Sequence, residues 1–185
     1  MGTSLEFWSV AFSALTFIVI AVTAIAALVQ LRHLRAANQL NALVTVMQDW
    51  QSPRMQEWVR FVRTELQARL EDPNYLLSLE DPGWRRDREK HPWLHLADYY
   101  EQLGSYIKYR LVDRNSYLEV NCLGVSDLYR RMEPCIEKVR EVAGTKAIFD
   151  NFEFLAVLGL QWIRLHPEGT YPRNLPRFKD VPKDS

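Results

Sequence analysis

Four positions between residues 91 and 101 carry the side chains in this sequence that are best suited to chemistry. In chain order they are His91, His95, Asp98 and Glu101 or its neighbour Gln102. The spacing puts the last three on one side of a helix, and imidazole and carboxylate groups that converge from one face bind ions such as Zn²⁺ or Mn²⁺. His91 precedes Pro92 and is expected outside that helix. The pattern allows a metal-dependent enzyme, but the preferred prediction is no metal and no cofactor, with an exposed histidine pair at a helix start.

The motif Tyr-Tyr-Glu-Gln-Leu-Gly at residues 99–104 supplies a second candidate. Its glutamate can be a buried carboxylate, with the glycine three residues later permitting a close helix crossing. We name Arg140 and Arg130 as partners for Glu101. Buried ion pairs more often set packing than perform catalysis. The prediction is therefore a structural ion pair between Glu101 and Arg140.

Other signatures of catalysis or nucleic-acid binding are missing from the sequence. It has no Gly-x-Ser-x-Gly elbow, no Walker A loop and no Rossmann fingerprint, and neither Cys122 nor Cys135 has a histidine nearby in sequence. The formal net charge is zero, and the basic aromatic triplet at residues 84–86 is short and offset by acids. We therefore expect no nucleic-acid partner. Two cysteines without metal-type spacing fit a reduced, cytoplasmic setting.

An uncharged run from Phe7 to Val29 must position everything that follows it. At roughly 1.5 Å per residue, a helix of this length crosses the roughly 30 Å hydrocarbon core with some tilt. A cleaved signal peptide is the rival hypothesis, because Ala24-Ile-Ala26 resembles a cleavage site, but no basic residue precedes the run. The sequence predicts a single-pass anchor in the lipid bilayer. Its main side chains are Phe7, Trp8, Phe17, Ile18, Ile20, Ile25 and Leu28.

The flanks of this run predict its orientation. Arg32 and Arg35 follow it, and no lysine or arginine precedes it. By the positive-inside rule the N-terminus lies outside and the large C-terminal part in the cytoplasm, at the inner (plasma) membrane. Small residues on one face allow self-association of the span, because they let helices approach closely. They are Ser9, Ser13, Thr16, Thr23 and Ala27, with the stripe broken by Ile20.

The periodicity of the remaining chain is helical throughout, so the predicted fold class is all-α. The predicted parts are a transmembrane anchor (1–30), a helical stalk (31–51) that continues the same helix from about residue 5, a cytoplasmic domain (52–166) of about four to five helices, and a Pro-rich extended tail (167–185). Within the domain we expect helices over 53–70, 93–111, 123–142 and 145–165, and a brief helix capped by Asn115 or Ser116 that runs to about residue 120.

Four segments resemble a family of small bacterial membrane proteins known only as a domain of unknown function. They are Gln30-Leu-Arg-His-Leu-Arg35, Tyr99-Tyr-Glu-Gln-Leu-Gly104, Leu111-Val-Asp113, and Arg140 followed by Phe152-Glu-Phe-Leu155. The resemblance spans most of the chain. It implies one N-terminal span and a helical cytoplasmic domain, and it implies no reaction, cofactor or catalytic residue.

Three functions follow from these patterns. The leading prediction is a non-enzymatic, membrane-anchored helical module for interaction or regulation, which holds a protein partner or copies of itself at the cytoplasmic membrane face. The first alternative is an oligomerising effector that perturbs the bilayer or forms a pore, as the stripe of small residues suggests. The second alternative is a metal-dependent enzyme around His95 and Asp98.

Overall fold

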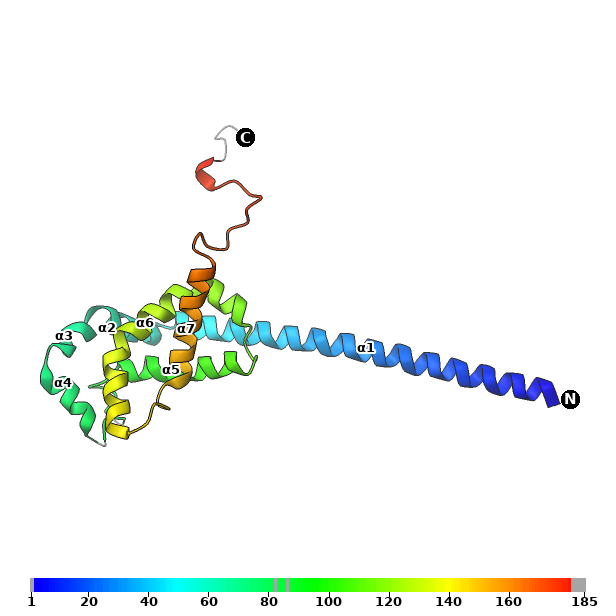
Figure 1. Ribbon diagram of the computed structural model, residues 1–185, viewed down its shortest axis with the longest axis horizontal. Helices are drawn as coiled ribbons and strands as arrows, with labels where there is room; N and C mark the ends of the chain where they lie inside the picture. The colour runs from blue at the N-terminus through cyan, green and yellow to red at the C-terminus, as the bar shows by residue number, and fades with distance from the viewer. Residues whose placement is uncertain (1, 82, 86, 181–185) are drawn as a thin grey trace. The chain divides into compact units, whose positions relative to one another are not determined.

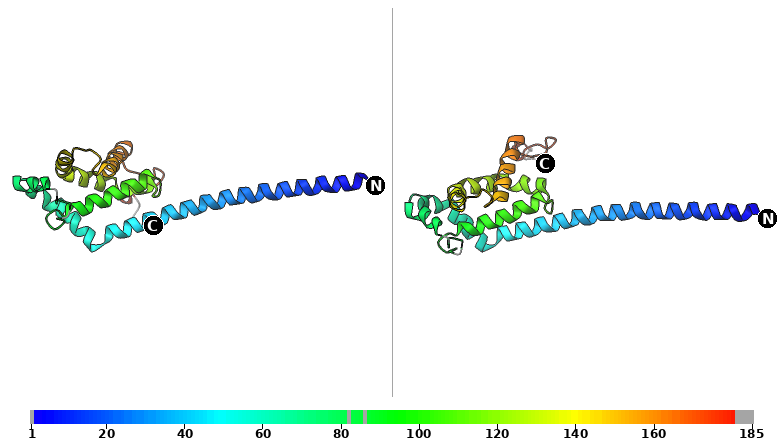
Figure 2. Two further views of the ribbon diagram at one scale, coloured as in Figure 1. Left: turned by 90° about the horizontal axis from the view of Figure 1, so that it is seen from below. Right: turned by 60° about the horizontal axis from the view of Figure 1, so that its bottom comes forward.

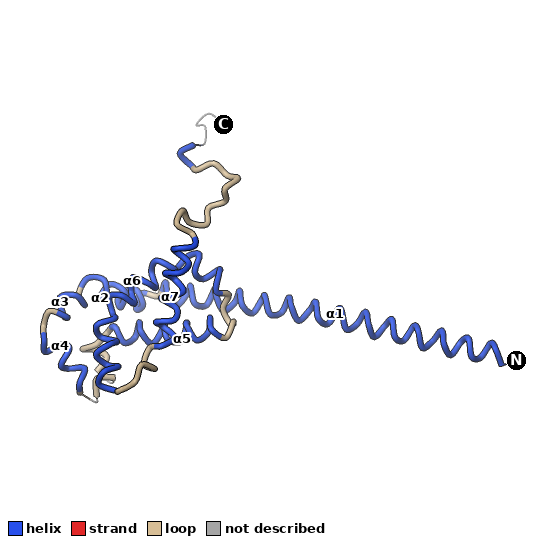
Figure 3. Tube along the Cα trace, in the orientation of Figure 1, coloured by secondary structure: helices blue, strands red, loops and turns tan. Residues whose placement is uncertain are grey.

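The computed structural model describes residues 2–81, 83–85 and 87–180. All regular secondary structure in these ranges is helical (Figure 3), which confirms the predicted all-α class. The chain divides into two compact units, residues 1–41 and 42–185. The last five residues of the predicted tail, and Arg86 of the basic aromatic triplet, lie outside the described residues.

The first unit is formed by most of helix α1 (Gly2–Gln51), the long helix labelled in Figure 1. No glycine or proline occurs between residues 3 and 51, so nothing in the sequence interrupts the backbone hydrogen bonding. The predicted continuous helix is thereby confirmed. Among the described residues α1 is the one helix that is long and apolar enough to span a membrane, and its most apolar stretch is unburied.

The last turns of α1 belong to the second unit. Val46 is buried, and Leu43 and Trp50 pack against the same hydrophobic core. The Tyr99 hydroxyl donates to the carbonyl oxygen of Val46 over 3.1 Å. Residues 42–51, which the sequence places in the stalk, are therefore part of the packed domain.

Short helices follow α1 and form one side of the core. Helix α2 (Pro53–Thr64) begins as predicted, with the Met55 N–H donating to the Ser52 hydroxyl over 3.3 Å. The predicted helix over 53–70 is interrupted at Glu65, after which α3 (Leu66–Leu70) starts. Helix α4 (Pro73–Leu77) and the 3₁₀ turn η1 (Ser78–Glu80) lie between the predicted helices over 53–70 and 93–111.

Three longer helices complete the domain and lie side by side in both views of Figure 2. They are α5 (Trp93–Lys108), α6 (Arg114–Ala143) and α7 (Asp150–Leu165). The core between them is aromatic at its centre, where the Tyr100 and Phe152 rings stack with centroids 4.7 Å apart. Helix α7 packs against both α5 and α6.

Two predicted boundaries around α6 are wrong. Asp113, rather than Asn115 or Ser116, caps the helix, because its carboxylate accepts both the N–H (2.8 Å) and the hydroxyl (2.7 Å) of Ser116. The predicted division between a brief helix that ends near residue 120 and a second helix over 123–142 is also wrong, because α6 is one helix that includes Pro134. It ends as expected at Gly144, which is left-handed with φ 65°.

Helix α7 starts five residues later than predicted. The segment 145–149 forms a turn that ends at Phe149, which is left-handed with φ 57°. Phe149 is 3% exposed and meets the Trp93 ring edge-on at 6.0 Å. Burial of this ring against α5 fixes where the chain turns into α7. Beyond α7 the described tail is irregular except for the 3₁₀ turn η2 (Phe178–Asp180).

Candidate functional site

The four residues considered as candidate metal ligands, His91, His95, Asp98 and Glu101, have separate partners and do not meet. Asp98 Oδ2 lies 2.6 Å from Arg88 Nη2, and the His95 ring stacks on the Trp58 ring with centroids 4.3 Å apart. Glu101 and His91 have other partners again, described below. Within the described ranges no group of three or more His, Cys, Asp or Glu side chains is placed to hold a metal ion.

Glu101 caps the start of α7, and the predicted ion pair with Arg140 is wrong. Its two carboxylate oxygens accept from the Asn151 amide (2.8 Å) and from the Phe152 N–H (3.0 Å). The first N–H groups of a helix have no partner inside it and carry partial positive charge, so a carboxylate stabilises them. Glu101 therefore fixes α5 to the beginning of α7.

Arg140 holds the turn between α6 and α7 instead. Its side chain is 6% exposed, and its Nε donates to the Ile148 carbonyl oxygen over 2.9 Å. Its two terminal nitrogens lie 2.8 Å from carboxylates of Glu137 and Glu153. Glu137 and Glu153 are the carboxylates that pair with Arg140, whereas both oxygens of Glu101 accept from Asn151 and Phe152, so Glu101 and Arg140 do not pair. Arg130, the other partner named from the sequence, is exposed.

His91 is one of the few buried polar residues, with 1% of its surface exposed, and it is not the exposed residue that the sequence predicts. The Ser78 hydroxyl donates its single hydrogen to the Tyr75 carbonyl oxygen over 2.6 Å. At the 3.2 Å contact between Ser78 Oγ and His91 Nε2, the nitrogen must then be the donor. The pKa of His91 is lowered, mainly by burial and to a smaller extent by the positive charge of Lys90. The negative charge of Asp87 acts in the opposite direction but does not outweigh burial. The ring is therefore neutral near pH 7, with its free lone pair on Nδ1.

The burial of His91 makes the stability of the domain pH-dependent. Its folded-state pKa lies below the unfolded value of 6.5, so the unfolded chain binds the proton more readily. The stabilisation is complete above about pH 6.5 and is lost as the pH falls toward the folded-state pKa. We expect the melting temperature of the full-length protein in detergent to fall between pH 7 and pH 5, and to fall less in His91→Gln. Equal slopes in both proteins would contradict this assignment.

His95 and Trp58 line a surface hollow of about 570 Å³ between α2 and the start of α5. The Arg54 guanidinium lies 5.5 Å from the centroid of the Trp58 ring, and Arg88 borders the same hollow. The pKa of His95 is lowered, first by burial and then by the positive charges of Arg88 and Arg54. We call the surface formed by Arg54, Trp58, Arg88 and His95 the aromatic groove. It presents stacked rings flanked by arginines.

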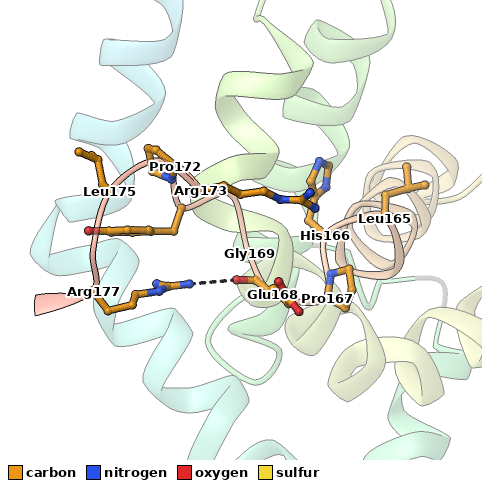
Figure 4. A pocket seen from close by; sticks show the side chains of 10 residues that line it. Leu165, His166, Pro167, Glu168, Gly169, Pro172, Arg173, Leu175 and Arg177 are labelled. Carbon is orange, nitrogen blue, oxygen red and sulfur yellow. Dashed lines mark hydrogen bonds between the residues drawn. The ribbon is translucent and has the colours of Figure 1, made fainter. Parts of the chain in front are cut away.

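A second hollow, of about 460 Å³, lies where the chain leaves α7 (Figure 4). Arg177 donates to the Glu168 carbonyl oxygen, drawn as a dashed line, and its guanidinium lies 4.1 Å from the Tyr171 ring centroid. Arg173 points toward His166. These contacts fold the first part of the tail, and Thr170 joins it to Glu119 of α6.

The residues predicted for membrane anchoring and self-association all lie on exposed α1. The anchor residues Phe7, Trp8, Phe17, Ile18, Ile20, Ile25 and Leu28 are each more than half exposed. The stripe Ser9, Ser13, Thr16, Thr23 and Ala27 is exposed as well. Thr16 and Thr23 donate their hydroxyl hydrogens to the carbonyl oxygens of Phe12 (2.8 Å) and Val19 (2.7 Å). Since those hydrogens are used inside the helix, close packing of small side chains is the contact that the stripe offers to another helix.

Several residues of these sites could not be identified from the sequence. Trp58 carries core-like helical spacing but lies half-buried, and only its ring contact with His95 distinguishes it from a core residue. Ser78 contacts His91 in the loop before α5, and Asn151 contacts Glu101 of α5, 50 residues away in the sequence. The one usable signal was the Glu101 to Gly104 spacing, which marked the close crossing of α5 and α7.

A family model described as a domain of unknown function (DUF4760) matches residues 17–162. The match runs from within the exposed part of α1 to near the end of α7. No curated protein and no solved structure matches the chain. The resemblance to an uncharacterised family is confirmed by this match.

Proposed function

The chain belongs to the DUF4760 family, and from its structure we propose that it is a membrane-anchored helical module that binds a protein partner at the cytoplasmic face of a bacterial inner membrane. One observation carries the proposal: a helix with a long apolar stretch entirely outside the packed core continues directly into a domain with its own core. Such apolar exposure is unfavourable in water and favourable in lipid.

The charge pattern supports the proposed orientation. Arg32 and Arg35 follow the apolar stretch, whereas no basic side chain precedes it. Basic flanks are retained on the cytoplasmic side. The packed domain, which follows these arginines, then lies in the cytoplasm, where its free Cys122 and Cys135 stay reduced.

The aromatic groove is the surface that we assign to the partner. Tryptophan and arginine are enriched among the residues that dominate binding energy at protein interfaces. Trp58 and His95 already stack, and Arg54 lies against the Trp58 ring, so little side-chain freedom is lost on binding. A partner segment that offers an apolar side chain would fit this surface, because Glu57 and Glu89 line the same hollow as Arg54 and Arg88 and balance their charge.

The pore hypothesis has less support than the module. The Thr16 and Thr23 hydroxyl hydrogens are engaged within the helix, and the span carries no charged side chain that could line a polar channel. Leakage of a dye from liposomes at high protein density would overturn this preference. Sealed vesicles at the same density would support the module.

Two acidic substitutions in the centre of the span should remove the protein from the membrane. Each charge at a helix centre costs about 2.5–3.5 kcal/mol in membrane insertion, so Ile18→Asp with Ile20→Asp abolishes the gain from the apolar run. We expect wild type to remain in the membrane pellet after alkaline extraction and the double variant to be released. Leu40→Asp, on an exposed position beyond the span, is the control and should stay in the pellet. Release of wild type would end the anchor proposal.

The partner surface is tested by photo-crosslinking of the full chain in membranes. A photoreactive aromatic residue in place of Trp58 should give a discrete adduct, and the same residue in place of exposed Tyr109 should not. An adduct of twice the 21.7 kDa chain mass would identify a second copy as the partner. A different discrete mass would identify another protein. Equal labelling at both positions, or none at Trp58, would contradict the assignment.

A further inference from the structure

A small hollow separate from the aromatic groove has a polar, partly buried floor. It measures about 260 Å³ and lies between η1 and the loop that leads to α5. Its lining residues are Ser78, Asp81, Gly83, Trp84, Asp87, Lys90 and His91. Trp84 and His91 are buried, whereas the charged residues at the rim are exposed.

The floor of the hollow requires a hydrogen-bond donor. Only 1% of the His91 surface is exposed, and its Nε2–H donates to the Ser78 hydroxyl oxygen. Its Nδ1 has no hydrogen-bond partner among the described residues. A buried acceptor without a partner is destabilising by about 1–3 kcal/mol. A bound molecule that donates to Nδ1 would remove this cost.

The rim favours a positive charge on that donor. Asp81 and Asp87 each use one carboxylate oxygen to hold the loop, through the N–H groups of Gly83 (2.6 Å) and Lys90 (3.0 Å). Both residues line the hollow, and both are exposed at its rim. Asp87 and Lys90 both lie close enough to act on His91, in opposite directions. The described rim residues therefore carry two carboxylates and one ammonium group, a net negative charge.

We propose that this hollow binds a small molecule with a primary ammonium group, which donates to His91 Nδ1 and to the rim carboxylates of Asp81 and Asp87. An ammonium group carries three N–H donors and no acceptor, which matches the free His91 Nδ1 acceptor on the floor and the acidic rim. Lys90 is placed to meet a negative group on the same molecule. An amino acid and a phosphoethanolamine headgroup share this chemistry.

The test is ¹⁵N NMR of the histidine side chains in the full-length protein in detergent, titrated separately with ethanolamine, glycine, phosphoethanolamine and acetate. Donation to His91 Nδ1 should move its resonance saturably with ethanolamine or glycine and leave it unmoved by acetate. Tighter binding of glycine would show that Lys90 binds a carboxylate, and tighter binding of phosphoethanolamine would point to a headgroup. Both results support the site. No saturable shift with any amine, or an equal shift with acetate, would overturn it.

Two isosteric variants show whether a loss of amine binding comes from the site itself or from misfolding. Asp87→Asn keeps the side-chain oxygen that accepts from the Lys90 N–H but removes the charge. It should weaken amine binding about tenfold or more, as expected for loss of a charged hydrogen bond. Glu89→Gln, which borders the aromatic groove instead, should leave affinity within about twofold. Equal weakening by both changes would also overturn the proposal.

Discussion

Gly104→Ala should lower the melting temperature of the protein by about 10 °C. A Cβ at this position would clash with the carbonyl oxygen of Asn151, which is backbone and cannot move without shifting α7. Overpacking of this kind costs about 3 kcal/mol, and for a chain of this size each kcal/mol corresponds to roughly 2–4 °C. The same shift would pull Asn151 and Phe152 away from the Glu101 carboxylate.

Gly124→Ala is the matched control for this prediction. It is also a glycine inside a long helix, but an added Cβ there would meet nothing within 4 Å. Alanine is favoured over glycine in helices by about 0.5–1 kcal/mol, so this variant should be slightly more stable than wild type. Thermal unfolding of the full chains in detergent, followed by near-ultraviolet circular dichroism, compares the three proteins. Similar melting temperatures for both variants would refute the close α5–α7 crossing.

Arg140→Met should destabilise the domain by about 3 kcal/mol. Methionine preserves the apolar stem but removes the Nε–H donated to Ile148 and both carboxylate contacts. Hydrogen bonds to charged groups contribute about 1.5–3 kcal/mol each, less than additively when they share one side chain. Glu137 and Glu153 are half-exposed and return to water, which limits the loss. The turn into α7 would lose its attachment to α6.

Two further variants separate this role from charge alone. Arg140→Lys keeps the charge but not the planar fork, so its stability should fall between wild type and Arg140→Met. Arg130→Met removes an exposed arginine of the same helix and should change the free energy of unfolding by less than about 0.5 kcal/mol. If Arg130→Met were as harmful as Arg140→Met, loss of net positive charge rather than the turn contacts would explain both.

The sequence predicted the local features well because their causes are local. The uninterrupted helix α1 follows from a stretch without glycine or proline. The cap of α2 follows from the hydroxyl of Ser52, and the end of α6 follows from Gly144, whose lack of a Cβ allows the left-handed backbone. The errors at Asp113 and Phe149 have another origin. Several residues in a row could have capped α6, and the start of α7 depends on burial of Phe149 against Trp93.

The candidate sites divide in the same way. Helical periodicity determined that the chain is all-α, and an uncharged apolar run gave one stretch long enough for a membrane. The spacing of Glu101 and Gly104 marked a helix contact. Only the tertiary structure decided that Glu101 caps α7, that Arg140 holds the α6–α7 turn, and that His91 is buried with a free Nδ1. Helical periodicity gives each side chain its face on its own helix. Its partner depends on which helix packs against that face, and for these residues the partner comes from another part of the chain.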